Sequence, residues 1–152
     1  MASRETRAPD GRDPDAGPGA VPLDQGFDRD SLYTLRAAVA AHAAHLGAAP
    51  DRVAHLVIVA SELASNAIRH GGGRGRLRLW RADGAVRCEV SDAGPGIPDP
   101  RSAGTVAPST LAPGGRGLWI VRQISAHVTI DSDRSGTTVT AAVAVPDAAT
   151  AA

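Results

Sequence analysis

The hydrophobic residues of the chain recur at two different periods, which separate predicted helices from predicted strands. Between residues 50 and 70 they are three and four positions apart, as in a helix with one buried face. A shorter stripe of this period runs from Leu32 to Leu46, where we expect Asp28 or Asp30 to cap the helix and Gly47 to end it. The apolar positions of the longer helix are Val53, Leu56, Val57, Ala60, Leu63, Ala64 and Ala67.

Other segments alternate between apolar and polar residues, which is the period of a strand with one buried face. Two of these segments flank a Gly-containing turn at residues 82–84 and therefore predict a hairpin. A third helix, with Leu118, Val121 and Ile124 on its apolar face, is expected between the third and fourth of the five expected strands. The expected strands cover residues 21–27, 76–82, 86–91, 128–131 and 137–145.

The alternation also places two polar side chains on the buried faces of strands. Val86, Cys88 and Val90 share one face, and one further step puts Asp92 on it. Thr137 opens the inward alternation of the last strand. Because burying an unpaired charge is costly, an inward Asp92 should meet a specific donor. The alternative is an ordinary turn aspartate before Gly94.

A carboxylate and an amide lie one turn apart on the longer predicted helix. Glu62 and Asn66 are four residues apart and therefore share one side of it, and Arg69 and His70 continue along that side. An amide oxygen can coordinate a hard cation, and a carboxylate can hold or deprotonate a nucleophile. The same spacing also occurs on ordinary solvated helix faces, so the pair alone leaves both interpretations open.

Two glycine-rich segments follow. Residues 92–98 form a tight loop whose glycines let another group approach the backbone closely. Residues 99–113 show no period and are interpreted as a flexible lid. Residues 114–117 open the third helix, where glycines would expose N–H groups at the positive end of the helix dipole and so suit a phosphate.

Composition bounds the kind of protein. The chain has 152 residues, and we expect one domain at 23–146 between disordered tails at 1–22 and 147–152. Sixteen basic residues balance sixteen acidic ones, so no nucleic-acid surface is expected. The single cysteine excludes an internal disulfide, and no apolar run reaches membrane-spanning length. We therefore expect a cytoplasmic protein without a membrane partner.

Taken in order, these motifs resemble the GHKL ATP-binding superfamily, which includes DNA gyrase, chaperone ATPases, histidine kinases and anti-sigma serine kinases. The resemblance covers about residues 28–145. It implies an α+β two-layer sandwich of the Bergerat type, with a mixed, mostly antiparallel sheet covered on one face by about three helices. It also implies ATP and Mg²⁺ as cofactors. The chain contains no Walker A lysine motif, so a P-loop enzyme is not expected.

The resemblance implies a role for each matching residue. Asn66 is similar to the magnesium-coordinating asparagine, and Glu62 to the general base that activates water or an acceptor hydroxyl. Asp92 resembles the carboxylate that accepts from the exocyclic amine of adenine, with Thr137 backing it directly or through water. The remaining nucleotide contacts are implied at Gly94, Gly96, Ile97, Gly115, Arg116, Gly117 and Leu118.

Within the superfamily, segments 66–71 and 115–121 resemble the small anti-sigma factor and serine/threonine kinase branch of actinobacterial type. This implies a kinase that phosphorylates an anti-anti-sigma (STAS-type) protein on Ser or Thr, with a sigma factor as a second partner and a homodimer as an open alternative. Ala112-Pro113 stands where such kinases often carry a basic residue. The rival is therefore a non-catalytic module that uses ATP to order the lid and select partners.

Overall fold

The computed structural model describes residues 22–97, 99–100, 102–105 and 116–146. Apart from Pro22, the predicted disordered tails lie outside the described residues, and so does most of the predicted lid, together with Gly115. The elements are β1 (Leu23–Asp28), a 3₁₀ turn (Arg29–Ser31), α1 (Leu32–His45), α2 (Pro50–His70), β2 (Arg74–Ala82), β3 (Ala85–Asp92), α3 (Arg116–Ile124), β4 (His127–Asp133) and β5 (Gly136–Ala144).

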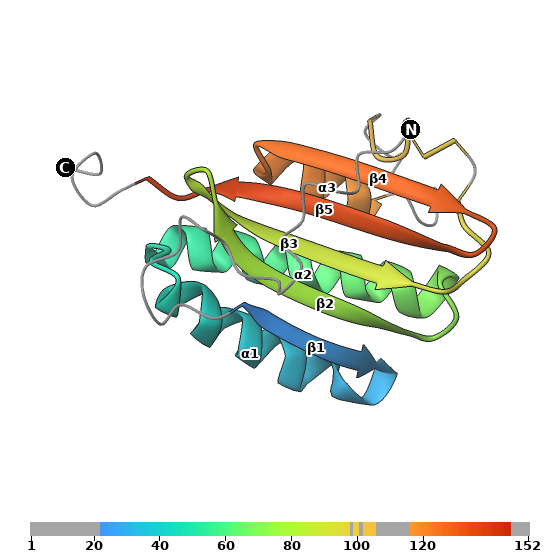
Figure 1. The fold of residues 1–152 in the computed structure, drawn as a ribbon, viewed down its shortest axis with the longest axis horizontal. Helices are drawn as coiled ribbons and strands as arrows, with labels where there is room; N and C mark the ends of the chain where they lie inside the picture. Colours follow the sequence, from blue (N-terminus) through green and yellow to red (C-terminus); the bar gives the residue numbers. More distant parts are fainter. Residues whose placement is uncertain (1–21, 98, 101, 106–115, 147–152) are drawn as a thin grey trace.

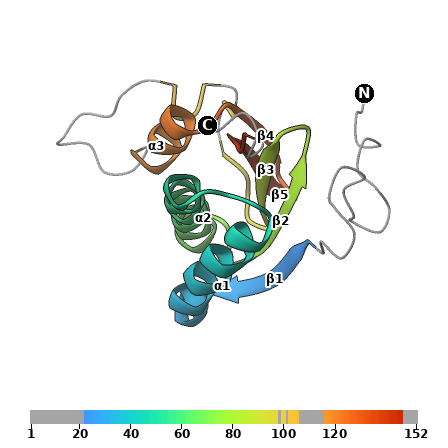
Figure 2. The same ribbon diagram turned by 90° about the vertical axis from the view of Figure 1, so that its left-hand side faces the viewer.

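The elements form two layers, with the helices on one face of a five-stranded sheet (Figures 1 and 2). The strand order is β1-β2-β3-β5-β4, and the four described pairings are all antiparallel. The predicted α+β two-layer sandwich, with a mostly antiparallel sheet and three helices on one face, is therefore confirmed. None of the described helices combines the length and the apolar character that a membrane crossing needs.

Local signals in the sequence set the helix ends. Asp28 accepts hydrogen bonds from the N–H groups of Asp30 and Ser31, so Asp28 is the cap of the first helical turn. Gly47 follows α1 with a φ of +96°, a conformation that glycine adopts without strain. Pro50 occupies the first turn of α2, where its missing N–H costs nothing. The predicted bounds of α2 are confirmed at both ends.

The core lies between the helices and the inner face of the sheet. The predicted alternation holds, since Leu77 and Leu79 on β2 and Cys88 on β3 are fully buried. Among the described residues, Thr137 is the one buried polar side chain, with 8% of its surface exposed. Side chains of complementary shape meet here from α1 and α2, and the largest of them are Leu35, Val39, Leu56, Val59 and Leu63.

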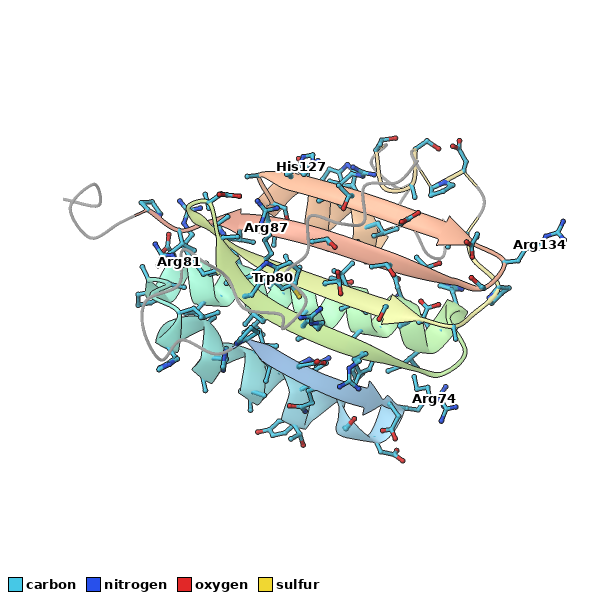
Figure 3. The ribbon with its side chains drawn as sticks, in the orientation of Figure 1. Arg74, Trp80, Arg81, Arg87, His127 and Arg134 are labelled. Carbon is cyan, nitrogen blue, oxygen red and sulfur yellow. The ribbon has the colours of Figure 1, made fainter. Side chains whose placement is uncertain are left out.

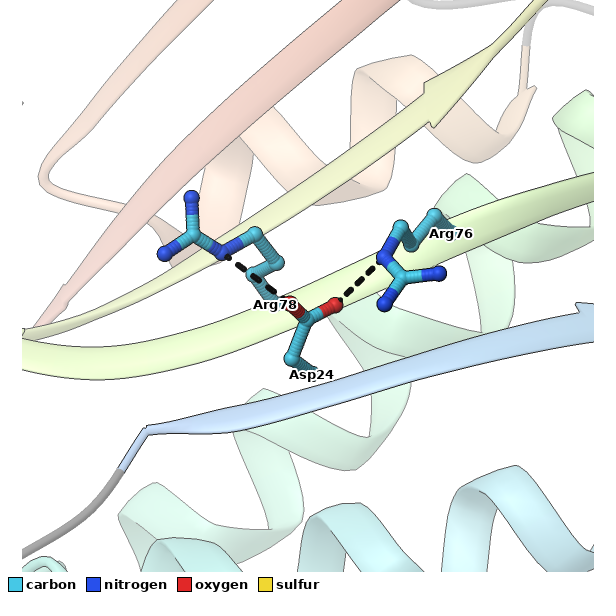
Figure 4. Close-up of polar contacts among 3 residues, drawn as sticks. All are labelled: Asp24, Arg76 and Arg78. Carbon is cyan, nitrogen blue, oxygen red and sulfur yellow. Dashed lines mark hydrogen bonds and ion pairs between the residues drawn. The ribbon is translucent and has the colours of Figure 1, made fainter. Parts of the chain in front are cut away.

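The outer face of the sheet is polar, as the alternation of β2 predicts. Asp24 of β1 lies between two arginines of β2, with 2.6 Å to Arg76 Nε and 3.9 Å to Arg78 Nε (Figure 4). The guanidinium of Arg78 also lies over the ring of Trp80, 5.7 Å from its centroid. The charges of Asp24 and the two arginines thus offset one another on a face that no described helix covers (Figure 2), although Arg78 Nε has no hydrogen-bond partner among the described residues.

Candidate functional site

Three polar side chains lie in a row across the end of the sheet. Asp92, the last residue of β3, pairs with Thr137 of β5, and Thr137 in turn pairs with Ser132 of β4. The carboxylate of Asp92 accepts a hydrogen bond of 2.9 Å from the N–H of Gly94. The hydroxyls of Ser132 and Thr137 are hydrogen-bonded to each other at 2.8 Å. The inward direction predicted for Asp92 and Thr137 thus joins them in one polar row.

The carboxylate of Asp92 lies against the end of α2. A β-carbon built on Gly71, the residue that follows α2, would overlap the carboxyl group of Asp92. A β-carbon on Gly94 would in turn lie 2.5 Å from the Cα of Gly71. Only residues without side chains fit this approach, because real β-carbons do not reach such distances. The glycines at 71 and 94 therefore bring the loop after β3 onto the last turn of α2.

The same loop is fastened to β4. The N–H of Ile97 donates a 2.9 Å hydrogen bond to Ser132 Oγ. Gly96 has a φ of +88°, and a β-carbon there would overlap the carbonyl group of Asp133. The predicted need for glycine at position 96 thus has two causes, its backbone conformation and its contact with β4.

Sequence reasoning did not single out Ser132. The expected strand ended at Asp131, whereas β4 extends to Asp133. The two additional residues carry the alternation of Val128 and Ile130 forward to Ser132, which is half-buried on the same side. Continued strand parity is the signal that could have identified it.

Glu62, the predicted general base, and Asn66, the predicted magnesium ligand, lie beside the start of α3. A β-carbon built on Gly117 would lie 2.7 Å from Glu62 Oε1 and 3.7 Å from Asn66 Oδ1. Asn66 Oδ1 also accepts a long hydrogen bond of 3.4 Å from Arg69. Glu62 and Asn66 therefore share one side of α2, as their spacing predicted, and both point toward the beginning of α3.

Two further predicted nucleotide contacts, Arg116 and Leu118, differ in their burial. Arg116 is exposed at the first described position of α3, and Leu118 is partly buried and packs against the core. A β-carbon on Gly104 would lie 2.7 Å from Leu118 Cβ, so the described end of the predicted lid touches α3. The nucleotide-binding roles assigned to these residues stay predictions.

The donor atoms of the site fit a magnesium–nucleotide complex. Mg²⁺ prefers oxygen ligands and usually keeps several waters, binding through one or two protein groups together with phosphates. Asn66 and Glu62 offer an amide and a carboxylate oxygen beside the amino end of α3, where a helix dipole favours an anion. At the other end of the site, the carboxylate of Asp92 is a hydrogen-bond acceptor that lies directly against the backbone of Gly71.

The geometry agrees with the family to which the chain is matched. Residues 27–143 match the family described as histidine kinase-like ATPase domain. Because this match covers most of the chain, the protein belongs to that family, and the resemblance to the GHKL superfamily is confirmed. No curated protein matches the chain.

Solved structures share the fold. The RsbU and RsbW domains of Rv1364c from Mycobacterium tuberculosis match with 24% identity and a TM-score of 0.61, covering 82% of this chain and 32% of that one. This chain therefore spans about a third of that protein. The SiaB–SiaC complex from Pseudomonas aeruginosa matches with 13% identity and a TM-score of 0.59, covering 81% and 89%. The blue-light activated histidine kinase EL346 from Erythrobacter litoralis has 19% identity, a TM-score of 0.52, and coverage of 78% and 43%.

Proposed function

We propose that this protein binds Mg-ATP and phosphorylates an anti-anti-sigma protein of the STAS type on Ser or Thr. The observation that carries the proposal is that α2 contacts both the start of α3 and the loop after β3. Near the end of α2, Glu62 and Asn66 lie beside Gly117 of α3, and Gly71 lies against Asp92. One helix end thus joins the two groups of residues that a nucleotide would bridge, and family membership supports this assignment.

Each end of the nucleotide has a chemically suited partner. Asp92 would accept a hydrogen bond from the exocyclic amine of adenine, with Thr137 beside it and Gly94 and Gly96 leaving room for the base. Asn66 would supply one oxygen ligand to Mg²⁺. The phosphates would meet the beginning of α3, where the proposed contacts are Gly115, Arg116, Gly117 and Leu118, and Ile97 is a further proposed nucleotide contact on the loop after β3.

The proposed reaction is an in-line phosphoryl transfer. Bound Mg-ATP would supply the γ-phosphoryl group. Glu62 would take the proton from the Ser or Thr hydroxyl of the partner, and the new P–O bond would form as the bond to the bridging oxygen of ADP breaks. The protein contributes mainly by positioning the groups and stabilising the charge that develops.

The partners are proposed from the branch that the sequence resembles. SiaB, which shares the fold, was solved in a complex with SiaC. A sigma factor as a second partner, a homodimer and a cytoplasmic location belong to the same proposal. The alternative function is a catalytically weak, ATP-gated binding module. It is favoured by Ala112-Pro113, which stand where kinases of the resembled branch often carry a basic residue.

A labelled-phosphate transfer assay tests the proposal. The full chain is incubated with Mg-ATP labelled at the γ-phosphate and with candidate STAS-type proteins, and nucleotide affinity is measured in parallel. We expect Glu62→Ala to lower transfer by about 10²-fold or more while ATP affinity changes little, because a general base acts in the transition state. Asp51→Ala, on an exposed position of the same helix, is the matched control and should retain transfer.

Two outcomes would contradict parts of this proposal. Tight ATP binding without transfer to any candidate would favour the binding module over the kinase. Equal losses of transfer and of ATP affinity in Glu62→Ala would argue against the base role, since that residue would then contribute to ground-state binding instead.

A further inference from the structure

We propose that Ser132 sets the preference for adenine by fixing the direction in which the hydroxyl of Thr137 donates its hydrogen bond. This inference rests on the proposed nucleotide site. Ser132 is not one of the residues that the motifs selected for nucleotide or metal binding. It acts through Thr137 and through the loop after β3, and is therefore a positioning residue.

Ser132 Oγ has two hydrogen-bond neighbours, and one of these bonds has a fixed direction. The backbone N–H of Ile97 can only donate, and it donates to Ser132 Oγ at 2.9 Å. The second neighbour of Ser132 Oγ is Thr137 Oγ1 at 2.8 Å. Either hydroxyl can donate in this bond. The proposal takes Ser132 as the donor, because its oxygen already accepts from Ile97 and its hydrogen then finds an acceptor at Thr137. In this direction the polarity runs from Ile97 through Ser132 to Thr137.

This polarity leaves the hydrogen of Thr137 for a ligand. Thr137 pairs with Asp92 across the sheet, and an ionised Asp92 can only accept. The row would thus present an acceptor at Asp92 beside a donor at Thr137. Adenine offers the complementary pair, an amine that donates and an adjacent ring nitrogen that accepts. Guanine offers the opposite pair at the same edge, a carbonyl oxygen and a ring N–H.

Ser132 also holds the loop against which the base would lie. Besides the bond from Ile97, its Oγ would be 3.0 Å from a β-carbon built on Gly96, so the loop is packed directly on this hydroxyl. Thr137 is buried, with 8% exposure, and its hydroxyl is hydrogen-bonded to Ser132 Oγ. Removing the hydroxyl of Ser132 would free the Thr137 hydroxyl to rotate and the loop to move away from β4.

Affinities for ATP and GTP test the inference. They are measured by calorimetry on the full chain for the wild type, Ser132→Ala and Ser132→Thr. We expect the ratio of ATP affinity to GTP affinity to fall by about tenfold in Ser132→Ala, the size of one well-placed hydrogen bond. Ser132→Thr keeps the hydroxyl and should restore the ratio. Thr129→Ala, at an exposed position on the opposite face of β4, should leave it unchanged.

A second pair of variants keeps the test decisive if Ser132→Ala does not fold. Ser132→Val and Ser132→Thr have nearly the same shape and differ in the hydroxyl, so their ATP to GTP ratios should differ even if Ser132→Ala does not fold. Amide hydrogen exchange of Ile97 in the nucleotide-free protein gives an independent readout. We expect about tenfold faster exchange in Ser132→Val than in Ser132→Thr, because the acceptor of that N–H is gone.

The results separate this inference from the proposed function. If the wild type prefers ATP but the hydroxyl-free variants keep its ATP to GTP ratio, the role of Ser132 is wrong and the ATP site stands. Equal losses of both affinities would have the same meaning, because a merely structural role lowers both. If the wild type binds neither nucleotide, the proposed ATP site fails, and the inference fails with it.

Discussion

Gly71 is the residue whose surroundings restrict the site most tightly. Its φ of −112° is open to any residue, yet a β-carbon there would overlap the carboxyl group of Asp92 and approach the carbonyl oxygen of Ala67 to 2.8 Å. Gly72 next to it has the opposite character, with a φ of +95° and no neighbour within 4 Å of a built β-carbon. Glycine is therefore required at position 71 by the crowding around its Cα, and at position 72 by its backbone conformation.

This contrast predicts different effects of the same substitution. Gly71→Ala should weaken ATP binding by about tenfold or more, because Asp92 must move away from its position beside α2. Gly72→Ala should leave ATP affinity unchanged and lower the free energy of unfolding by about 1–2 kcal/mol, the cost of a left-handed backbone with a β-carbon. Calorimetric titration and urea unfolding of both variants check this. A loss of affinity in Gly72→Ala alone would contradict it.

Cys88 gives a prediction about pH. Burial in the core raises the pKa of its thiol from 9.0 to about 12, with a smaller contribution from the charge of Glu89. The unfolded chain therefore loses this proton at lower pH than the folded protein does. The stabilising contribution of the neutral thiol is complete below pH 9 and is lost progressively between pH 9 and 12, by up to about 1.4 kcal/mol per pH unit.

Urea unfolding between pH 7 and 11 tests this expectation. The free energy of unfolding of the wild type should fall more steeply above pH 9 than that of Cys88→Ala, which has no thiol to ionise. Equal slopes would contradict the prediction. The native thiol should also resist alkylation at pH 8, because Cys88 is fully buried and uncharged there.

At this scale, strand parity determined which site residues the sequence could reveal. Asp92 and Thr137 lie at positions where the alternation of apolar residues continues into a polar one, so their inward direction was predictable. Ser132 follows the same rule, but the polar residues at the end of β4 conceal where the strand stops. The close contact between Gly71 and Asp92 joins segments twenty residues apart, and no local pattern encodes it.

Among the elements, the bounds of α2 were the most predictable, whereas the packing of α3 on α2 was not predictable. Apolar spacing, Pro50 and the glycines after His70 define α2 at both ends. The packing of α3 on α2, by contrast, depends on a side chain that is missing at Gly117, so that Glu62 Oε1 can come close. Periodicity predicts that such helices have a buried face, but it does not say which helices will meet.

Arg81 connects three elements at the opposite end of the sheet from Asp92. It continues the inward alternation of Leu77 and Leu79, yet it carries a charge (Figure 3). Its guanidinium donates to the carbonyl of Leu46 at 2.9 Å, after α1, and to that of Val145 at 3.4 Å, after β5. Both carbonyls lie just beyond the end of a regular element, where a side-chain donor can satisfy them.

Replacing Arg81 should therefore cost much more than replacing a neighbouring arginine. Arg81→Met should lower the free energy of unfolding by about 1.5–3 kcal/mol, because charge-assisted hydrogen bonds in a half-buried site are lost. Arg87→Met is the matched control. Its ion pair with Asp83, at 3.6 Å, has an exposed carboxylate on one side, and ion pairs near the surface contribute about 0–1 kcal/mol. Urea unfolding measures both, and equal losses would show that Arg81 does not connect these elements.

For the molecule as a whole, the order of the motifs along the chain carried more information than any single motif. Glu62 with Asn66, the loop after Asp92 and the glycines before Leu118 are each weak signals, but their order predicted the two-layer fold that the structure has. The order of the motifs does not predict the distance between α3 and the end of the sheet at Asp92. That distance decides whether one ligand can contact both Asn66 and Asp92.

Binding of one ligand to both groups predicts a stabilisation that depends on magnesium. A ligand that binds only the folded state raises the free energy of unfolding by about 2.7 kcal/mol at a hundred times its dissociation constant. For a domain of this size, that corresponds to a rise in Tm of about 5–10 °C. We expect Mg-ATP to produce such a shift and ATP with EDTA a smaller one, because Asn66 then has no cation to share with the phosphates.

Asn66→Ala should abolish the difference between the two conditions while retaining a shift from the adenine end, where Asp92 is unchanged. Gln123→Ala, which removes an exposed amide from α3, should keep the full magnesium dependence and serves as the control. Equal shifts with magnesium and with EDTA in the wild type would contradict the metal role of Asn66. Because Asn66 and Asp92 would contact opposite ends of the proposed ligand, a wild type that shows no shift with any nucleotide would instead contradict the shared site itself.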